Sequence, residues 1–186
     1  MNVTAVNTIY TPEEYIQLEQ AGEIRHEYIN GNLIEMSGAS REHHKVCKKI
    51  LALLESLLII QHYEVYIENM KVAIPGENQY FYPDILVTKE AETNQNRYVQ
   101  YQPELIAEVL SETTRTKDTI DKFIQYRKIP TLEYYLLVEP EKPLVICYFR
   151  NESNEWDMAS YTRIEETISL PKLAVTIPLQ KIYSSL

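Results

Sequence analysis

Residues 105–110 read Leu-Ile-Ala-Glu-Val-Leu, and this stretch decides the fold class. Five apolar residues around one acid are typical of a strand that is buried on both faces, as at the centre of a sheet covered by helices. Residues 116–128 follow with apolar side chains at helical spacing and stop before Pro130, which cannot continue a helix. A fully buried strand followed by a helix predicts an α/β fold.

The flanking segments extend this pattern in both directions. Thr11-Pro12-Glu13-Glu14 has the composition of a capped helix start, and Asn30-Gly31 is a dipeptide favoured in two-residue hairpin turns. We therefore expect one domain over residues 1–186, with an α/β core at about 11–139 and an antiparallel, β-rich tail at 140–186. The predicted helices are residues 11–21, 40–61 and 116–128; the predicted strands flank the turn within 25–37 and cover 63–74, 80–88, 104–110, 133–139, 144–150, 156–162 and 167–170.

Composition narrows the class of protein. The chain has 186 residues, 18 Lys+Arg, 27 Asp+Glu and a net charge of −9, and its four glycines form no phosphate-binding loop motif. Cys47 and Cys147 lack the spacing of metal ligands, so we expect buried or idle thiols in a reducing compartment. No export signal is visible, and the apolar run 50–60 is shorter than the roughly 20 residues of a membrane span. We expect a soluble cytoplasmic protein with no membrane partner.

Three acids stand out by their context: Glu27 at the predicted hairpin, Asp84 in Tyr-Pro-Asp-Ile, and Glu108 within the buried strand. A carboxylate in an apolar strand is costly unless it is paired or binds a cation. One interpretation is an acid that faces solvent or pairs with Lys or Arg. The alternative is that two carboxylates on neighbouring strands hold Mg²⁺, which prefers oxygen ligands and keeps several waters. One such water could become a hydroxide nucleophile.

Several short motifs follow one another along the chain. They are Glu27, Gly31, His43, Pro83-Asp84, Glu108-Val109-Leu110-Ser111, Lys122, Tyr126 and the stretch 126–135. In this order and spacing they resemble the Uma2 family (DUF820) of restriction-endonuclease-like proteins, over about residues 10–182. The resemblance implies the PD-(D/E)XK nuclease fold, a mixed central sheet flanked by helices, here with extra antiparallel strands at the C-terminus. In that fold an Asp and a Glu chelate Mg²⁺ for phosphodiester hydrolysis.

The resemblance also implies individual roles. Asp84 matches the Asp of the PD motif and Glu108 the acid of the (D/E)XK motif, which makes them the implied Mg²⁺ ligands, with Mn²⁺ as a substitute ion. Glu27 matches an upstream acid that such folds often add. Leu110 stands where the superfamily has its catalytic lysine, and Lys122 is the substitute that the family implies. A cation there could orient the attacking water or stabilise charge on the phosphate.

Two observations argue against this role for Lys122. On a helical wheel Ile120, Phe123 and Ile124 define the apolar face, and Lys122 lies nearly opposite it. Asp118 precedes Lys122 by four residues, so a surface ion pair is the alternative.

His43 and Tyr126 are expected at the edge of the same site, because His43 aligns with the family and Tyr126 follows Lys122 by one helical turn. Neighbouring positions on a helix face different directions, so we do not expect His43 and His44 to bind one metal ion. The alternatives are a solvated helix start for His43 and ordinary half-buried packing for Tyr126.

The charge distribution bears on the partner. A chain of net charge −9 should bind nucleic acid weakly overall, but residues 41–49 and 115–128 each carry +3 and could form a basic cradle. Our first prediction is a metal-dependent endonuclease acting on nucleic acid, with DNA as the first candidate. The alternative is a non-catalytic binding or interaction module that keeps the nuclease fold. The third prediction is a glycosidase in which two acids act as a general acid and base on a sugar. We rank it last because the chain has one Trp that could stack on a saccharide. The tyrosine-rich strands after residue 133 could supply a homodimer face.

Overall fold

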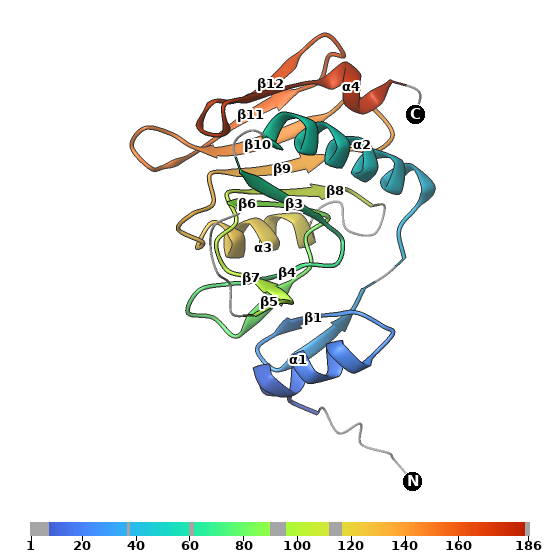
Figure 1. Cartoon of the computed structure of the whole chain (residues 1–186), viewed down its shortest axis with the longest axis vertical. Helices are drawn as coiled ribbons and strands as arrows, with labels where there is room; N and C mark the ends of the chain where they lie inside the picture. Colours follow the sequence, from blue (N-terminus) through green and yellow to red (C-terminus); the bar gives the residue numbers. More distant parts are fainter. Residues whose placement is uncertain (1–7, 37, 60–61, 90–95, 112–116, 185–186) are drawn as a thin grey trace.

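The computed structural model describes residues 8–36, 38–59, 62–89, 96–111 and 117–184 (Figure 1). Its helices are α1 (Pro12–Ala21), α2 (Arg41–Leu58), α3 (Lys117–Tyr126) and α4 (Leu179–Tyr183), with a 3-10 turn at Pro171–Leu173. One set of strands is β3 (Tyr63–Ile67), β6 (Ile85–Lys89), β8 (Leu105–Val109), β9 (Tyr134–Val138), β10 (Val145–Arg150) and β11 (Trp156–Tyr161). The others are β1 (His26–Ile29), β2 (Asn32–Glu35), β4 (Lys71–Ala73), β5 (Gln79–Phe81), β7 (Val99–Gln100), β12 (Thr167–Leu170) and β13 (Val175–Pro178).

Within the described residues the strands form three sheets. A six-stranded sheet has the order β11-β10-β9-β8-β6-β3, a five-stranded sheet has the order β2-β1-β5-β4-β7, and β12 pairs with β13. β8 lies inside the six-stranded sheet, and all five of its residues are buried, as the sequence predicts. It pairs antiparallel with β6 and parallel with β9, so this sheet is mixed.

Helices cover both faces of the six-stranded sheet (Figure 1). On one face α2 and α4 pack against Ile85, Ala107 and Leu136. On the other face Tyr126 of α3 packs against Ile106. Each helix buries an apolar stripe against the sheet. This burial stabilises the fold by roughly 25 cal/mol of free energy per Å² of apolar surface removed from water.

The five-stranded sheet begins with the predicted hairpin. Asn30 and Gly31 have φ angles of 49° and 90°, the left-handed values that a type I′ turn requires. α1 starts with the predicted capping box and packs on this sheet, where Tyr15 stacks on Tyr28 with ring centroids 4.9 Å apart. The hairpin and α1 therefore form one local unit.

The sequence prediction of two long strands over residues 63–74 and 80–88 is wrong. The first breaks after β3, where Glu68 takes a left-handed backbone conformation with φ of 53°. The second breaks between β5 and β6, where Pro83 offers no N–H to a strand ladder. The halves join different sheets, since β3 and β6 lie in the six-stranded sheet and β4 and β5 in the five-stranded one. Asp84 therefore lies where the chain passes between the sheets.

The C-terminal strands extend the core. β10 and β11 continue the six-stranded sheet from β9 as antiparallel neighbours, as predicted for the tail. The sequence patterns do not predict β7, β13 or α4. In β9, the first of the tyrosine-rich strands that could supply a homodimer face, Tyr134 and Tyr135 are buried inside the chain.

Some predicted boundaries, at Ser37, Gln61 and Thr116, lie outside the described residues. Both cysteines are buried and free, as expected. None of the helices in the described part of the chain is long and apolar enough to cross a membrane.

Candidate active site

Asp84 lies directly before β6. Its Oδ2 accepts a hydrogen bond from the backbone N–H of Val109, 2.7 Å away at the end of β8. The same oxygen lies 3.1 Å from Nε2 of His43, in the first turn of α2. Because an ionised carboxylate can only accept, Nε2 carries the proton of this contact. Asp84 thus connects two strands and the start of a helix.

Glu108 is the acid inside β8. Its Oε1 accepts a hydrogen bond from the hydroxyl of Tyr126 at 3.0 Å and lies 3.4 Å from Nζ of Lys122. Both partners are on α3, and Tyr126 is fully buried, with its ring edge-on against Phe81. Tyr126 therefore combines core packing with a contact to the predicted site.

The strand register relates Asp84 to Glu108. Ile85 pairs with Ala107 in the antiparallel ladder between β6 and β8. Asp84 lies one residue before this ladder and Glu108 one residue after Ala107, and the charge of Asp84 acts to raise the pKa of Glu108. Two neighbouring carboxylates are suited to a shared cation; the binding itself stays a prediction.

The helical-wheel argument against Lys122 is wrong. Ile120 and Ile124 are 57% and 43% exposed, whereas the Lys122 side chain is 19% exposed. Its Nζ lies 2.7 Å from Oε1 of Glu27 and 3.4 Å from Oε1 of Glu108. The helix buries this side because the two carboxylates compensate for the lost hydration of the ammonium group.

The charges around Lys122 favour binding of a further cation. Burial alone would lower the pKa of Lys122, but the carboxylates of Glu108 and Glu27 raise it above its ordinary value, so the ammonium stays charged. Burial raises the pKa of Glu108 to about 7, against the opposing effect of Lys122. When ionised, Glu27, Asp84 and Glu108 exceed Lys122 by two negative charges, which a divalent cation would balance. The side chain of Asp118, the alternative partner of Lys122, lies outside the described part of the chain.

Glu27 comes from β1 of the other sheet. Its Oε1 is buried and, apart from the charge contact with Lys122, makes no hydrogen bond of ordinary geometry among the described residues. Glu27, Asp84 and Glu108 together do not form one of the groups, among the described residues, whose ligand atoms all lie within 4.8 Å of one another, whereas Asp84 forms such a group with His43 and Cys47. The contacts make Glu27 the partner of Lys122, and direct metal ligation by Glu27 stays a prediction.

Asp84 and Glu108 have the donors that Mg²⁺ prefers. In each carboxylate the protein holds one oxygen, whereas Asp84 Oδ1 and Glu108 Oε2 have no hydrogen-bond donor among the described residues. Two carboxylate oxygens with water in the remaining positions are an ordinary Mg²⁺ ligand set. The residues therefore fit the implied ion.

His43 lies at the edge of this cluster and is buried, so the alternative of a solvated helix start is wrong. Its Nδ1 faces the sulfur of Cys47 at 3.6 Å, a contact that the sequence did not indicate. Burial lowers the pKa of His43, but the hydrogen bond and charge of Asp84 outweigh it and raise the pKa. His43 thereby holds Asp84 from the α2 side.

The structure brings donor atoms of His43 and His44 closer together than their neighbouring helix positions suggest. His44 Nδ1 lies 3.0 Å from Oε1 of Glu68, and one donor atom from each of His43, His44 and Glu68 lies within 4.8 Å of the other two. The two imidazole rings meet edge-on, with centroids 5.9 Å apart. The pattern Ser-Arg-Glu-His-His could have suggested this cluster, but Glu68 could not be placed from sequence.

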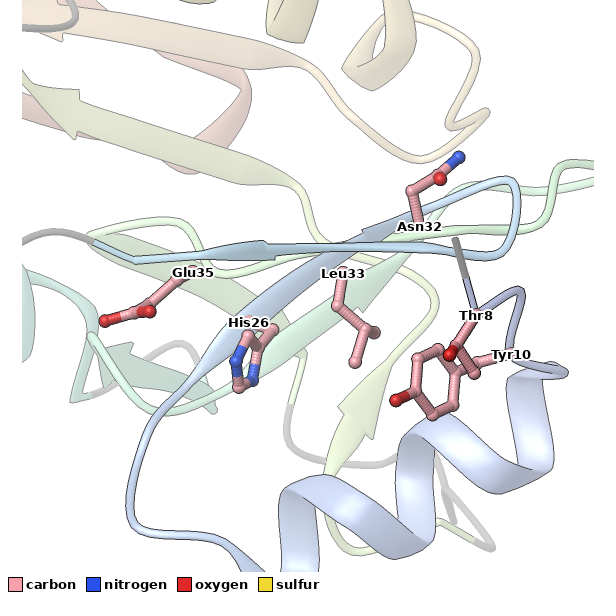
Figure 2. Close-up of a pocket in the computed structure, with 6 residues that line it drawn as sticks. All are labelled: Thr8, Tyr10, His26, Asn32, Leu33 and Glu35. Atoms are coloured by element: carbon pink, nitrogen blue, oxygen red, sulfur yellow. The ribbon is translucent and has the colours of Figure 1, made fainter. Parts of the chain in front are cut away.

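A cavity of about 340 Å³ lies elsewhere, on the hairpin (Figure 2). It is lined by Thr8, Tyr10, His26, Asn32, Leu33 and Glu35. Side chains alternate along β1, so His26 faces away from Glu27 and the cavity opens on the opposite side of the hairpin. It contains none of the predicted site residues.

Comparison with known proteins identifies the family of the chain. A family model described as "Uma2: Putative restriction endonuclease" matches residues 12–180. The chain belongs to the Uma2 family. This confirms the resemblance drawn from the motifs and covers nearly all of the described residues.

Two curated relatives of this Uma2 chain come from Synechocystis sp. (strain ATCC 27184 / PCC 6803 / Kazusa). "Uncharacterized protein sll1609" is 36% identical over 158 residues, covering 84% of this chain and 89% of the relative. "Uncharacterized protein slr1290" is 28% identical over 176 residues, covering 95% and 92%.

A solved structure shares the fold. The crystal structure of a "putative nuclease belonging to DUF820" from Anabaena variabilis ATCC 29413 superposes with a TM-score of 0.78 at 16% identity, covering 94% of this chain and 98% of that one. The predicted fold class is therefore confirmed: a mixed sheet flanked by helices with added antiparallel strands, as in that structure.

Proposed function

We propose that this Uma2 protein is a metal-dependent endonuclease that hydrolyses phosphodiester bonds in nucleic acid, with DNA as the first candidate substrate. The observation that carries the proposal is the position of Lys122, whose ammonium lies between the carboxylates of Glu27 and Glu108. A largely buried lysine beside two acids, with Asp84 close enough for its charge to act on the ammonium, has the composition of a hydrolytic phosphate site.

Asp84 and Glu108 would hold Mg²⁺, or Mn²⁺ in its place, through Asp84 Oδ1 and Glu108 Oε2, which have no hydrogen-bond donor among the described residues. When bound, the ion supplies Lewis acidity toward a phosphate oxygen and lowers the pKa of a bound water. Lys122 donates hydrogen bonds toward the water or the phosphate, which stabilises the negative charge that grows as the P–O bond breaks. Leu110 occupies the usual lysine position and has no charge, so Lys122 on α3 supplies the cation instead.

The surrounding residues fix these groups before substrate arrives. Glu27 orients Lys122 and keeps it charged, and Tyr126 holds one oxygen of Glu108. His43 and the Val109 N–H hold Asp84. Pre-set hydrogen bonds of this kind avoid reorganisation during the reaction.

Nucleic acid as the partner is supported by local charge. Arg41, Lys45 and Lys48 are exposed on α2, the helix that begins with the His43 contact to Asp84. α2 and α3 cover opposite faces of the six-stranded sheet, so the described basic residues of α2 and of α3 do not lie on one face. We expect DNA to approach along the α2 side, with an affinity that falls steeply as salt rises.

The decisive experiment is a cleavage assay on single- and double-stranded DNA and RNA with Mg²⁺, Mn²⁺ or EDTA. We expect metal-dependent cleavage that Asp84→Asn and Lys122→Met abolish, and that Glu55→Gln, an exposed acid on α2, retains. Binding of nucleic acid without cleavage under every condition would favour the non-catalytic module instead.

A homodimer and a cytoplasmic location stay predictions. Light scattering on the purified chain tests the first; a monomer mass at micromolar concentration would contradict it.

A further inference from the structure

A second group of metal-ligating side chains lies beside the proposed active site. It consists of His43, His44 and Glu68, which we call the His43–His44–Glu68 cluster. One donor atom from each residue lies within 4.8 Å of the other two, and His44 Nδ1 is 3.0 Å from Glu68 Oε1. Two donors bound to one ion at about 2.0–2.2 Å lie roughly 3–4 Å apart. Small side-chain movements would bring all three donors onto one ion.

The donor set selects the kind of ion. Two imidazole nitrogens and one carboxylate suit borderline transition metals such as Zn²⁺, whereas Mg²⁺ takes oxygen donors almost alone. This chemistry therefore differs from that of Asp84 and Glu108. No sequence pattern indicated a role for Glu68, and His44 was expected to face another direction than His43.

The cluster is built from two elements that the fold brings together. Both histidines lie in the first turn of α2, while Glu68 lies in the break between β3 and β4. The backbone N–H of Glu68 donates to the carbonyl of Asp84 at 3.0 Å, and His43 contacts the Asp84 carboxylate at 3.1 Å. An ion on the cluster would thus lie next to groups that contact Asp84.

The cluster is also accessible. The side chains of His44 and Glu68 are 52% and 33% exposed, so a hydrated ion can reach them and keep water ligands. His43 contributes from the buried side, which limits the number of open coordination positions.

We propose that the His43–His44–Glu68 cluster binds one divalent transition-metal ion of the Zn²⁺ class, separately from the Mg²⁺ site. The ion takes the place of the hydrogen-bonded proton between His44 and Glu68. If His43 binds through Nε2, its ring proton moves to Nδ1, which faces the Cys47 sulfur at 3.6 Å. The proposal does not depend on phosphodiester hydrolysis.

Direct metal binding tests the proposal. Zn²⁺ titration by calorimetry, and the visible spectrum of the Co²⁺-loaded protein, should report one equivalent in the wild type. His44→Ala and Glu68→Gln should each weaken affinity at least about tenfold, because each removes a ligand. His62→Ala and Glu55→Gln are the matched controls, an exposed histidine and an exposed acid outside the cluster, and should bind as the wild type does.

Glu108→Gln separates this site from the proposed active site. It should retain Zn²⁺ and Co²⁺ binding while losing the Mg²⁺ response, so failure of either proposal leaves the other standing. Unchanged Zn²⁺ affinity in folded His44→Ala and Glu68→Gln would overturn the proposed cluster site. Loss of Zn²⁺ affinity in Glu108→Gln would also overturn it. Circular dichroism confirms folding, and a misfolded Glu68→Gln leaves the decision to the exposed His44→Ala.

Discussion

Lys122 and Glu27 form an ion pair across the two large sheets: Nζ of Lys122, on the helix that covers the six-stranded sheet, lies 2.7 Å from Oε1 of Glu27 in the five-stranded sheet. The lysine also reaches Glu108, so it joins both sheets at the proposed site. A surface lysine could be truncated with little effect, whereas this one is placed to affect stability, metal binding and cleavage together.

We predict that Glu27→Gln destabilises the fold by about 1–3 kcal/mol, because Lys122 loses a charged partner in a largely buried place. Urea unfolding measures this change. The matched control is Glu77→Gln, which breaks the exposed pair with Lys128 and should cost about 0–1 kcal/mol. Equal losses in the two variants would show that the Glu27 pair is no more than a surface contact.

Lys122→Met should bind Mg²⁺ about tenfold more tightly and yet lose cleavage. Removing the ammonium relieves repulsion of the incoming ion, an effect on the order of 1.4 kcal/mol, while the group that assists the reaction is gone. Calorimetry with Mg²⁺ and the cleavage assay measure the two effects, and Lys128→Met is the control. Weaker Mg²⁺ binding together with intact cleavage would remove Lys122 from the mechanism.

Tyr126→Phe and Tyr135→Phe should differ although both tyrosines are fully buried. The first loses the hydroxyl that donates to Glu108 and should cost about 1–3 kcal/mol. The second removes a buried hydroxyl that has no hydrogen-bond partner among the described residues, so we expect a neutral or stabilising change. Thermal unfolding without metal compares them, and a larger loss for Tyr135→Phe would contradict the assignment of Tyr126.

Asp84→Asn should leave the protein folded but insensitive to Mg²⁺. The new amide oxygen can still accept from the Val109 N–H, while the charge that attracts the ion is lost. Mg²⁺ at a hundred times its dissociation constant should stabilise the wild type by about 2.7 kcal/mol and leave this variant unchanged. Asp121→Asn, an exposed acid on α3, should respond as the wild type does. A full Mg²⁺ response in Asp84→Asn would place the ion elsewhere.

Local pattern was sufficient for much of the fold. The capping residues of α1, the Asn30-Gly31 turn, the apolar stripe of α2 and the buried strand around Glu108 all depend on neighbours a few residues apart. The motif spacing also singled out Asp84, Glu108 and Lys122 before any contact was known. These features are encoded in short stretches because backbone preference and hydrophobic period act over one or two turns.

Only the tertiary structure decided where those stretches meet. The breaks at Glu68 and before Asp84, which send the chain from one sheet to the other, are not visible in alternation of apolar residues. The helical wheel placed Lys122 away from the core because it considers apolar side chains alone. In the structure, the helix instead directs Lys122 toward two carboxylates from distant strands. Likewise, His44 meets Glu68 because α2 begins beside the break after β3. Pairings between distant residues depend on sheet register and helix docking, and no short segment of sequence contains that information.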